Sequence, residues 1–300
     1  MNDELLLLKD VSLSYYGTDF CIRDINLSMQ SGKRLTVYGR EGSGKTLLLR
    51  AIAGLEESDF GDIILDGKNL RDVAVKDRGI GFTFDFSSLQ KVKSVSQIIE
   101  YPMKLRGYSQ EQMEKAVESA CDSFEIDKLA AVESLEDFDK AKALLARLFA
   151  IERKLYVVDD VWKDLERDKQ LQIIRLLKEV AADKSVVIAT QDVEFAREFD
   201  GEVVVLSKGE CARPKLLEEH SVRPTNMETA ILCGYAIFKS VLQRGENGYF
   251  AELENNEYSV EEPLSDIYVG KEVCFAVGER GATGFYYDKD CERIISKEKL

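Results

Sequence analysis

The chain has 300 residues, enough for one large domain or two smaller ones. Its hydrophobic fraction of 45% is ordinary for a globular protein, whereas its formal net charge is −14. A chain this acidic is a poor ligand for nucleic acid or for an anionic membrane surface. Its sequence also has no apolar run near the roughly 20 residues of a spanning helix. We therefore expect no nucleic-acid partner and no direct membrane insertion.

The six cysteines are scattered, and no two form a C-x-x-C pair. This pattern favours reduced thiols of a cytoplasmic protein over disulfides or a zinc site. The first residues, Met1–Leu6, lack the basic start and small-residue cleavage site of a secretory signal. We therefore expect a cytoplasmic location.

Strand patterns open the chain. Residues 4–8 and 11–15 predict two strands and residues 25–29 a third, because apolar side chains run together or alternate. These segments predict an antiparallel β section. Residues 34–38 predict a further strand that leads directly into a glycine-rich loop.

The glycine-rich loop over residues 39–46 fits G-x-x-x-x-G-K-[ST], the phosphate-binding P-loop. Glycines let successive backbone N–H groups face anionic oxygens, and the helix predicted over 46–55 adds its positive N-terminal end. We expect Lys45 on the β- and γ-phosphates of ATP and the Thr46 hydroxyl on Mg²⁺. The alternative is a glycine-rich turn without a ligand. The expected nucleotide-binding residues are Gly39, Arg40, Glu41, Gly42, Ser43, Gly44, Lys45 and Thr46.

A change of pattern follows the next two predicted strands, 61–67 and 79–84. Between residues 94 and 150 the sequence predicts only helices, one of them opened by the capping box Ser109-x-x-Gln112. We interpret residues 86–150, approximately, as a helical insertion within an α/β domain.

Two carboxylates, Asp159 and Asp160, follow an apolar run typical of a buried strand. In a parallel sheet, ligand-binding groups gather at the carboxyl ends of strands. Asp159 is therefore expected to hold the Mg²⁺ bound by Thr46; the alternative is a cap for the next helix. Another predicted strand, 185–190, ends at Gln191.

The pattern breaks up between residues 214 and 224, which include the single histidine, His220, interpreted as a linker residue. From about residue 236 short strands alternate with Gly and Asn, which suggests a small open barrel of the oligonucleotide/oligosaccharide-binding (OB) type. We expect an ATP-binding domain over 1–220, and a connector with this β-domain over 221–300.

Taken in order and spacing, the P-loop, the helical insertion, Asp159-Asp160 and Gln191 resemble ABC transporter ATPases. The tail resembles maltose-type sugar importer ATPases. The resemblance implies an α/β P-loop NTPase fold with an antiparallel β section and a helical insertion, plus a C-terminal OB-like β-barrel. The tail segments concerned are Pro224-x-Asn226-x-x-x-Ala230-x-x-x-Gly234, Tyr268–Lys271 and 288–294.

The resemblance also implies partners. Such subunits dimerise around two ATP molecules. They sit at the inner face of the cell membrane, bound to transmembrane permease subunits. A short coupling helix of each permease subunit enters the helical insertion of an ATPase subunit. Tyr16 matches the aromatic residue that stacks on adenine; a core or hairpin aromatic is the alternative reading.

The sequence departs from the family at four positions around the γ-phosphate. Residues 135–139 are Leu-Glu-Asp-Phe-Asp where the family has the signature Leu-Ser-Gly-Gly-Gln. Asp160 replaces the catalytic Glu, Gln191 replaces the switch His, and Asp85 replaces a Gln but remains able to ligate a cation. Three carboxylates in the signature would repel ATP, and Asp is one methylene shorter than Glu as a base.

We therefore expect Mg-ATP binding to be retained and hydrolysis to be weakened or lost. A second, competent ATPase subunit would complete a heterodimer. One alternative is a non-catalytic, ATP-dependent regulatory or assembly protein without a permease. Another is an ordinary active importer ATPase.

Overall fold

A computed structural model gives the fold of the chain. It describes residues 4–18, 20–84, 92–211, 215–216, 227–245, 248–253, 256–260, 263, 265–277 and 285–287. The chain divides into a first unit, Met1–Pro214, and a second unit, Lys215–Leu300. The predicted metal ligand Asp85, the linker His220 and the segment 288–294 lie outside the described residues.

The first unit begins with an antiparallel sheet in the order β2-β1-β4-β5. The two strands predicted at 4–8 and 11–15 are in fact one strand, β1, and this prediction is wrong. Asp10 has a φ of 49° and the pairing register shifts between Leu8 and Val11, so the break in the sequence pattern marks a β-bulge and not a turn. The strands are β1 (Glu4–Ser14), β2 (Cys21–Gln30), β4 (Phe60–Leu65) and β5 (Lys68–Asn69).

A second, mainly parallel sheet follows the order β10-β9-β3-β8-β7-β6. Strands β9, β3, β8, β7 and β6 are parallel to their neighbours, and β10 pairs with β9 antiparallel. Because β3, β8 and β7 are adjacent, the segments that follow them leave the sheet at the same edge. The strands are β3 (Arg34–Tyr38), β6 (Ile80–Phe82), β7 (Leu155–Asp159), β8 (Val186–Thr190), β9 (Glu202–Ser207) and β10 (Glu210–Cys211).

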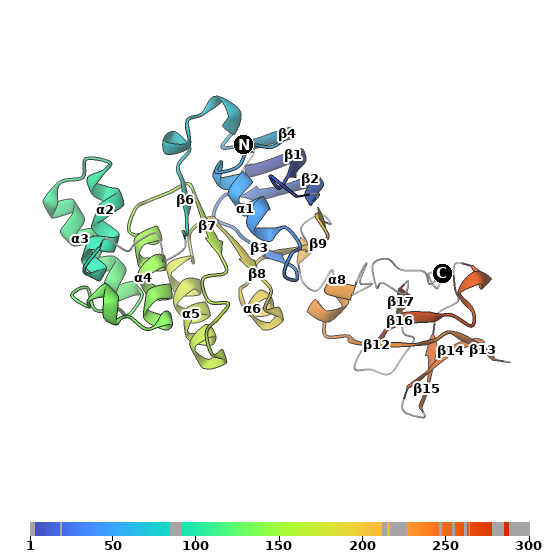
Figure 1. The fold of residues 1–300 in the computed structure, drawn as a ribbon. Helices are drawn as coiled ribbons and strands as arrows, with labels where there is room; N and C mark the ends of the chain where they lie inside the picture. Colours follow the sequence, from blue (N-terminus) through green and yellow to red (C-terminus); the bar gives the residue numbers. More distant parts are fainter. Residues whose placement is uncertain are drawn as a thin grey trace. The chain divides into compact units, whose positions relative to one another are not determined.

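The parallel sheet is buried on both faces (Figure 1). In β7, Leu155 and Val157 pack with α1 and the antiparallel sheet, whereas Tyr156 and Val158 pack with α4, α5 and α6. This alternation is the period of two expected for a strand, and burial on both faces explains the near-continuous apolar run. The helices are α1 (Lys45–Ala53), α4 (Asp137–Phe149), α5 (Arg167–Val180) and α6 (Val193–Glu198).

Helices α2 (Val95–Lys104) and α3 (Gln110–Ser123) pack with α4 into a helical lobe. The predicted capping box is present: the Gln112 N–H donates to Ser109 Oγ at 3.2 Å and the Ser109 N–H donates to Gln112 Oε1 at 2.9 Å. No helix of the described ranges is long and apolar enough to cross a membrane. Short 3-10 turns lie at Leu70–Asp72, Val75–Asp77 and Val132–Ser134.

The second unit contains two three-stranded antiparallel sheets, ordered β12-β16-β17 and β13-β14-β15. Their core includes Leu242, Ala251, Val260, Val273 and Phe275. Closure of these strands into an OB-like barrel stays a prediction. The elements are β11 (Lys215–Leu216), α8 (Met227–Leu232), β12 (Ala236–Val241), β13 (Gln243–Gly245), β14 (Gly248–Leu253), β15 (Asn256–Val260), a 3-10 turn (Asp266–Tyr268), β16 (Glu272–Val277) and β17 (Phe285–Tyr287).

The expectation that every cysteine is a reduced thiol is wrong at Cys274, which is disulfide-bonded. Cys274 lies in β16, opposite Tyr287 of β17. Spacing along the chain does not reveal such a bond, because it depends on how these strands pair. Four other cysteines, Cys21, Cys121, Cys211 and Cys233, are free.

Candidate nucleotide site

The P-loop joins the end of β3 to the start of α1, and its backbone needs glycine. Gly42 and Gly44 have φ angles of 75° and 103°, in the left-handed region that other residues rarely adopt. At Gly39, a Cβ would lie 2.3 Å from the Leu206 carbonyl oxygen and 2.6 Å from Ser43 Oγ. Gly39 therefore has no room for a side chain, and Gly42 and Gly44 have backbone angles that would strain any other residue.

Free donors in this loop fit a polyphosphate. The hydrogen-bond ladder of α1 begins with the Leu48 N–H, which donates to the Gly44 carbonyl at 2.9 Å. The preceding amides of the first turn therefore have no intrahelical acceptor. Ser43 Oγ is buried without a hydrogen-bond partner. Polar groups like these, at a helix N-terminus, are the ordinary ligands of phosphate oxygens.

Lys45 supplies the positive charge. It is 9% exposed, and its Nζ donates to the carbonyl oxygens of Gly39 at 2.8 Å and Arg40 at 2.9 Å. Burial lowers the pKa of Lys45, while the carboxylates of Asp160 and Asp159 act in the opposite direction. The ammonium is thus held inside the loop, where an anionic ligand would relieve its desolvation.

Neighbouring segments support the loop, and the sequence did not reveal them. The Gly209 N–H, in the turn between β9 and β10, donates to the Ser43 carbonyl at 3.1 Å. The ring of Phe20 lies against Gly44, where a Cβ would be only 3.0 Å from its Cζ. The sequence indicates only a hairpin turn at Gly209 and an aromatic residue before β2 at Phe20, so neither was marked as part of the site.

The predicted magnesium ligands Thr46 and Asp159 lie together. Thr46 Oγ1 donates to Asp159 Oδ1 at 3.2 Å, and the Asp159 N–H donates to Thr83 Oγ1 at 2.9 Å. Burial raises the pKa of Asp159, and the Thr46 hydrogen bond and the Lys45 charge oppose that rise. A hydroxyl beside a carboxylate suits Mg²⁺, which takes few protein ligands and completes its shell with waters and phosphate oxygens. Within the described ranges no group of three or more His, Cys, Asp or Glu side chains gathers to hold a metal.

Asp160 and Gln191 are brought together at the same sheet edge. The Gln191 N–H donates to Asp160 Oδ2 at 3.4 Å, whereas Asp160 Oδ1 is buried without a hydrogen-bond partner. Asp160 has a φ of 40°, a strained conformation for a non-glycine residue. Burial raises the pKa of Asp160 to about 6. Oδ1 therefore has no acceptor bond of its own, whereas Oδ2 is already partly engaged by the Gln191 N–H.

The segment aligned with the family signature, residues 135–139, runs from the end of a 3-10 turn at Leu135 through the N-cap Glu136 into the first residues of α4. Each of its carboxylates is paired with a lysine, which the sequence prediction of charge repulsion did not take into account. Lysine charges therefore offset the acidic side chains within the chain itself. The N···O distances are 2.7 Å for Asp137–Lys140, 2.8 Å for Asp139–Lys142 and 3.5 Å for Glu136–Lys169.

Tyr16, the expected adenine-stacking residue, lies in the turn between β1 and β2. Its side chain is fully exposed, and Phe20, not Tyr16, lies against the P-loop. Stacking of Tyr16 on adenine stays a prediction.

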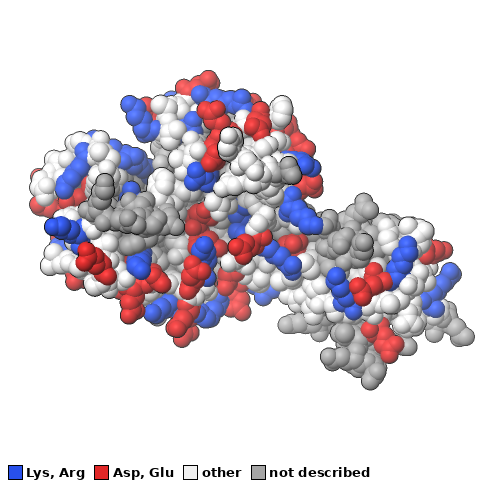
Figure 2. Space-filling view, viewed as in Figure 1, with Lys and Arg blue, Asp and Glu red and all other residues white. Residues whose placement is uncertain are grey.

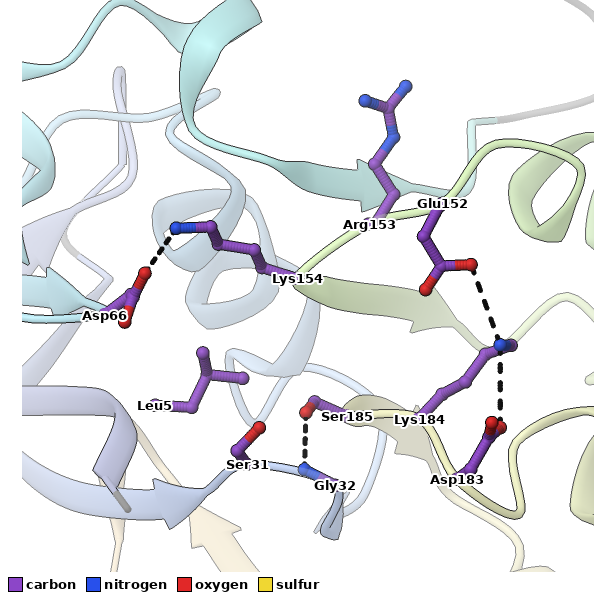
Figure 3. A pocket seen from close by; sticks show the side chains of 10 residues that line it. All are labelled: Leu5, Ser31, Gly32, Asp66, Glu152, Arg153, Lys154, Asp183, Lys184 and Ser185. Carbon is purple, nitrogen blue, oxygen red and sulfur yellow. Dashed lines mark hydrogen bonds and ion pairs between the residues drawn. The ribbon is translucent and has the colours of Figure 1, made fainter. Parts of the chain in front are cut away.

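A separate hollow of about 420 Å³ lies at the amino ends of β7 and β8, the opposite edge of the sheet (Figure 3). Its lysines are neutralised: Lys154 pairs with Asp66, and Lys184 lies 3.5 Å from Asp183 and 3.8 Å from Glu152. It contains none of the predicted site residues, so we place the candidate site at the P-loop edge.

Comparison with known proteins agrees with this geometry. Residues 22–163 match the family model described as ABC transporter. The fold matches the ATP-binding cassette MJ0796 bound to ADP and Pi, with a TM-score of 0.63 and 23% sequence identity. The match covers 71% of this chain and 98% of the MJ0796 chain. CbiO1 from Clostridium perfringens matches with a TM-score of 0.65 and 20% identity, over 74% of this chain and 96% of that one. The first unit therefore has the fold of these ATP-binding cassettes, and its residues 22–163 are similar to the ABC transporter family.

Relatives with known names are importer ATPases. The chain is 29% identical to a sulfate/thiosulfate import ATP-binding protein of Synechocystis sp., over 74% of this chain and 63% of that protein. It is 31% identical to the protein of that name in Bacillus cereus, over 70% and 62% of the two lengths. An Fe(3+) ions import ATP-binding protein of Pasteurella multocida is 26% identical over 85% and 75%. The chain thus spans less than two thirds of the first two relatives, and these names do not single out the maltose-type branch.

Proposed function

We propose that the chain is the ATP-binding subunit of an ABC importer, which holds Mg-ATP firmly and hydrolyses it slowly or not at all. The observation that carries this proposal is a contrast within one site. The residues that would hold phosphate and Mg²⁺ are assembled, whereas those that would act on the γ-phosphate and the attacking water are altered.

For binding, Gly39 to Thr46 would hold the phosphates through backbone amides and the Lys45 ammonium. Thr46 and Asp159, whose oxygens are 3.2 Å apart, would hold Mg²⁺, and Asp85 is a further proposed ligand. Tyr16 would stack on adenine. Bound Mg²⁺ would neutralise charge on the phosphates.

For hydrolysis, the carboxylate that directly follows Asp159, at the position of the family's catalytic Glu, is the shorter side chain of Asp160. One of its oxygens already accepts the Gln191 N–H at 3.4 Å. A general base must come within about 3.2 Å of the proton it takes or act through a single water, and the shorter side chain reduces that reach. Gln191 contributes an amide but no charge. A second ATPase subunit with an ordinary signature and base would compensate for both, so we propose a heterodimer.

The direction of transport and its cargo rest on different observations. The tail resembles maltose-type ATPases and favours a sugar, whereas the named relatives import sulfate, thiosulfate or Fe(3+) ions. Import is common to all of them. We therefore propose import and leave the cargo to the permease, which alone would contact it.

A permease partner is supported by an arginine patch formed by Arg106 and Arg147 of the helical lobe and by Arg153, which precedes β7. None of the three has an ion pair with any residue the structure describes. Burial lowers the pKa of Arg147 and of Arg153, and the nearby Arg106 charge lowers both further. Figure 2 shows Lys and Arg side chains gathered at the end of the lobe where α2 and α3 are joined. In a chain of net charge −14, a basic patch without an ion pair among the residues that the structure describes fits an acidic partner.

Exposed apolar side chains accompany these arginines. Leu105 is 71% exposed, Tyr101 54% and Phe84 42%. The Arg147 guanidinium lies 5.9 Å from the centroid of the Phe84 ring. Exposed apolar groups beside unpaired charge are typical of a protein-binding surface. We propose that this surface receives an acidic, partly apolar segment of the permease.

The decisive experiment measures nucleotide binding and hydrolysis on the same purified chain. We expect saturable Mg-ATP binding that Lys45→Ala abolishes and Lys33→Ala, an exposed lysine substitution outside the loop, leaves intact. We expect turnover far below that of the Synechocystis relative assayed beside it. Family-level turnover that disappears in Asp160→Ala would reject slow hydrolysis, and an absence of binding would reject the whole proposal. Purification from detergent-solubilised membranes without any membrane-spanning protein would favour the regulatory alternative.

A further inference from the structure

The only tryptophan of the sequence, Trp162, lies two residues after Asp160 and is completely buried. Its ring stacks on Phe195 of α6, with centroids 3.9 Å apart and planes inclined by 10°. A buried indole needs an acceptor for its N–H. That acceptor is Thr190 Oγ1 at 3.4 Å, in the last residue of β8 before Gln191.

Further bonds extend this contact on both sides. Thr190 Oγ1 also accepts the Asp192 N–H at 3.0 Å, and the Trp162 carbonyl accepts Gln170 Nε2 at 3.3 Å. Arg167 lies 3.1 Å from an Asp192 carboxylate oxygen. The segment after β7 and the segment after β8 are thus joined by side chains of both.

A second link joins the same two segments at the candidate site itself, where the Gln191 N–H donates to Asp160 Oδ2 at 3.4 Å. The two segments are therefore joined by two hydrogen bonds. One runs from the Gln191 N–H to Asp160, and the other from the Trp162 indole N–H to Thr190. Because Gln191 follows Thr190 directly and Trp162 follows Asp160 by two residues, the two bonds and the chain between them form a closed ring. The strained backbone of Asp160, with a φ of 40°, is thus fixed by the Gln191 hydrogen bond to its side chain and by the buried Trp162 two residues further on.

We propose that Trp162, acting through Thr190, is a positioning residue that holds the Asp160 and Gln191 segments in fixed register, so that they respond to nucleotide as one unit. This inference rests on the proposed function, because it takes the P-loop edge as the nucleotide site. It adds that the indole hydrogen bond and the Phe195 stack determine where the Asp160 carboxylate stands. Trp162 itself would not touch ATP.

The alternative is that Trp162 only fills the core. The chain offers a matched control for this alternative in Thr36, on the neighbouring strand β3. Thr36 is 1% exposed and its hydroxyl has no hydrogen-bond partner. Thr36→Val and Thr190→Val therefore make the same change in one sheet, and only the second removes the acceptor of the indole N–H.

Because the sequence has a single tryptophan, emission excited selectively at the indole reports on the surroundings of Trp162, which include this hydrogen bond and the Phe195 ring. The experiment titrates the full-length chain with Mg-ATP, following emission, and measures binding separately by equilibrium dialysis with radiolabelled ATP. We expect an emission change with the midpoint of the binding curve. Binding that saturates without any emission change would overturn the inference while the proposed function stands. An absence of binding would instead reject the proposed function.

Variants then separate positioning from packing. We expect Thr190→Val to reduce the emission change by at least half and the single-turnover hydrolysis rate by about fivefold, the effect of one hydrogen bond, with the Kd for Mg-ATP within about twofold of wild type. Thr190→Ser should restore both, and Thr36→Val should change neither. Trp162→Phe should slow turnover as Thr190→Val does, and the double variant no further, because both remove one bond. The inference would be overturned if Thr190→Val and Thr36→Val had the same emission change and turnover rate, or if Thr190→Val weakened only the affinity for Mg-ATP. Where turnover is too slow to measure, the emission changes of the two variants decide.

Discussion

The Thr46 hydroxyl donates to Asp159 Oδ1 across 3.2 Å, although the two residues are 113 positions apart in the sequence. This contact joins the start of α1 to the end of β7. It arises because β3 and β7 lie on either side of β8 in one parallel sheet, so that the segments after them leave at the same edge. Two oxygen ligands are thereby placed beside the P-loop lysine.

The first prediction concerns the metal. Asp159→Asn keeps the shape of the side chain and the Thr46 contact but removes the negative charge that would hold Mg²⁺. We expect the affinity for ATP with Mg²⁺ to fall to the level measured in EDTA, while the affinity in EDTA itself stays near the wild-type value. Isothermal titration with and without Mg²⁺ checks this. Asp164→Asn, an exposed carboxylate on the following turn, serves as the control, and an undiminished magnesium effect in Asp159→Asn would remove Asp159 from the metal site.

The second prediction concerns stability and pH at Asp160. Burial raises its pKa in the folded protein to about 6, above the roughly 3.9 of an unperturbed Asp side chain. The folded state therefore binds the proton more tightly than the unfolded state. Its free energy of unfolding should fall as pH rises from about 4 to about 6 and stay level above that, by at most about 3 kcal/mol for this group. Asp160→Asn, which has no charge to desolvate, should therefore melt several degrees higher than wild type at pH 7.5 and lose that advantage at pH 4.5.

Asp137→Asn is the control of opposite sign. The hydrogen bond from Lys140 lowers the pKa of Asp137, so its ionised form contributes stability above the unfolded-state pKa that is lost as pH falls. Thermal unfolding of both variants across this pH range checks both signs. A melting temperature of Asp160→Asn equal to wild type at pH 7.5 would mean that the Asp160 carboxylate is not desolvated.

The sequence predicted the P-loop, the parallel strands and the helical lobe well, because each depends on local patterns. Alternating and buried apolar runs, the Ser109 capping box and the glycines of the P-loop are all short-range features. The bulge at Asp10 was missed, because the alternation it interrupts also fits two separate strands. The disulfide at Cys274 and the lysine partners of the signature carboxylates were also missed, because they depend on neighbours distant in space or on the next helical turn.

The lysines around residues 136–139 illustrate this limit. Lys140 and Lys142 lie one turn along α4, but Lys169 comes from α5, and only packing of α4 with α5 brings it to Glu136. Likewise, Asp159, Asp160 and Gln191 could be identified singly, whereas the Trp162–Thr190 bond depends on the side-chain conformation at the ends of two strands. Sequence patterns identify the groups that line the site, and packing decides how those groups are held.

The third prediction concerns the signature segment. Replacing residues 135–139 with Leu-Ser-Gly-Gly-Gln removes the three carboxylates and, with them, the ion pairs of Asp137 with Lys140, Asp139 with Lys142 and Glu136 with Lys169. The start of α4 would then present positive charge and free amides, both of which favour phosphate. We expect Mg-ATP to drive dimerisation of this variant in light scattering, whereas the unmodified chain stays monomeric alone. ATP-dependent dimers of the unmodified chain would contradict a damaged signature.

The fourth prediction concerns the arginine patch. We expect the double variant Arg106→Glu, Arg147→Glu to lose its membrane-spanning partner. The measurement is co-purification of that partner with the tagged chain from detergent-solubilised membranes of the cells that express it. The reason is that the paired acidic segment would meet two carboxylates in place of two guanidinium groups. Mg-ATP binding should be unchanged, because neither residue belongs to the P-loop edge. Thermal unfolding should show that the variant is folded, because Arg106→Glu removes a charge that repels Arg153 whereas Arg147→Glu places a carboxylate at a partly buried position.

Arg175→Glu is the matched control for this variant, since Arg175 is an exposed arginine of α5 whose charge is already paired with Glu125 at 3.0 Å. Its substitution should leave recovery of the partner intact although the net charge changes in the same direction. Equal losses of the partner in both variants would show a general charge effect. Full recovery with the Arg106 and Arg147 variant would place the permease-binding surface elsewhere on the chain, because an acidic segment cannot dock against two reversed charges without a loss of affinity.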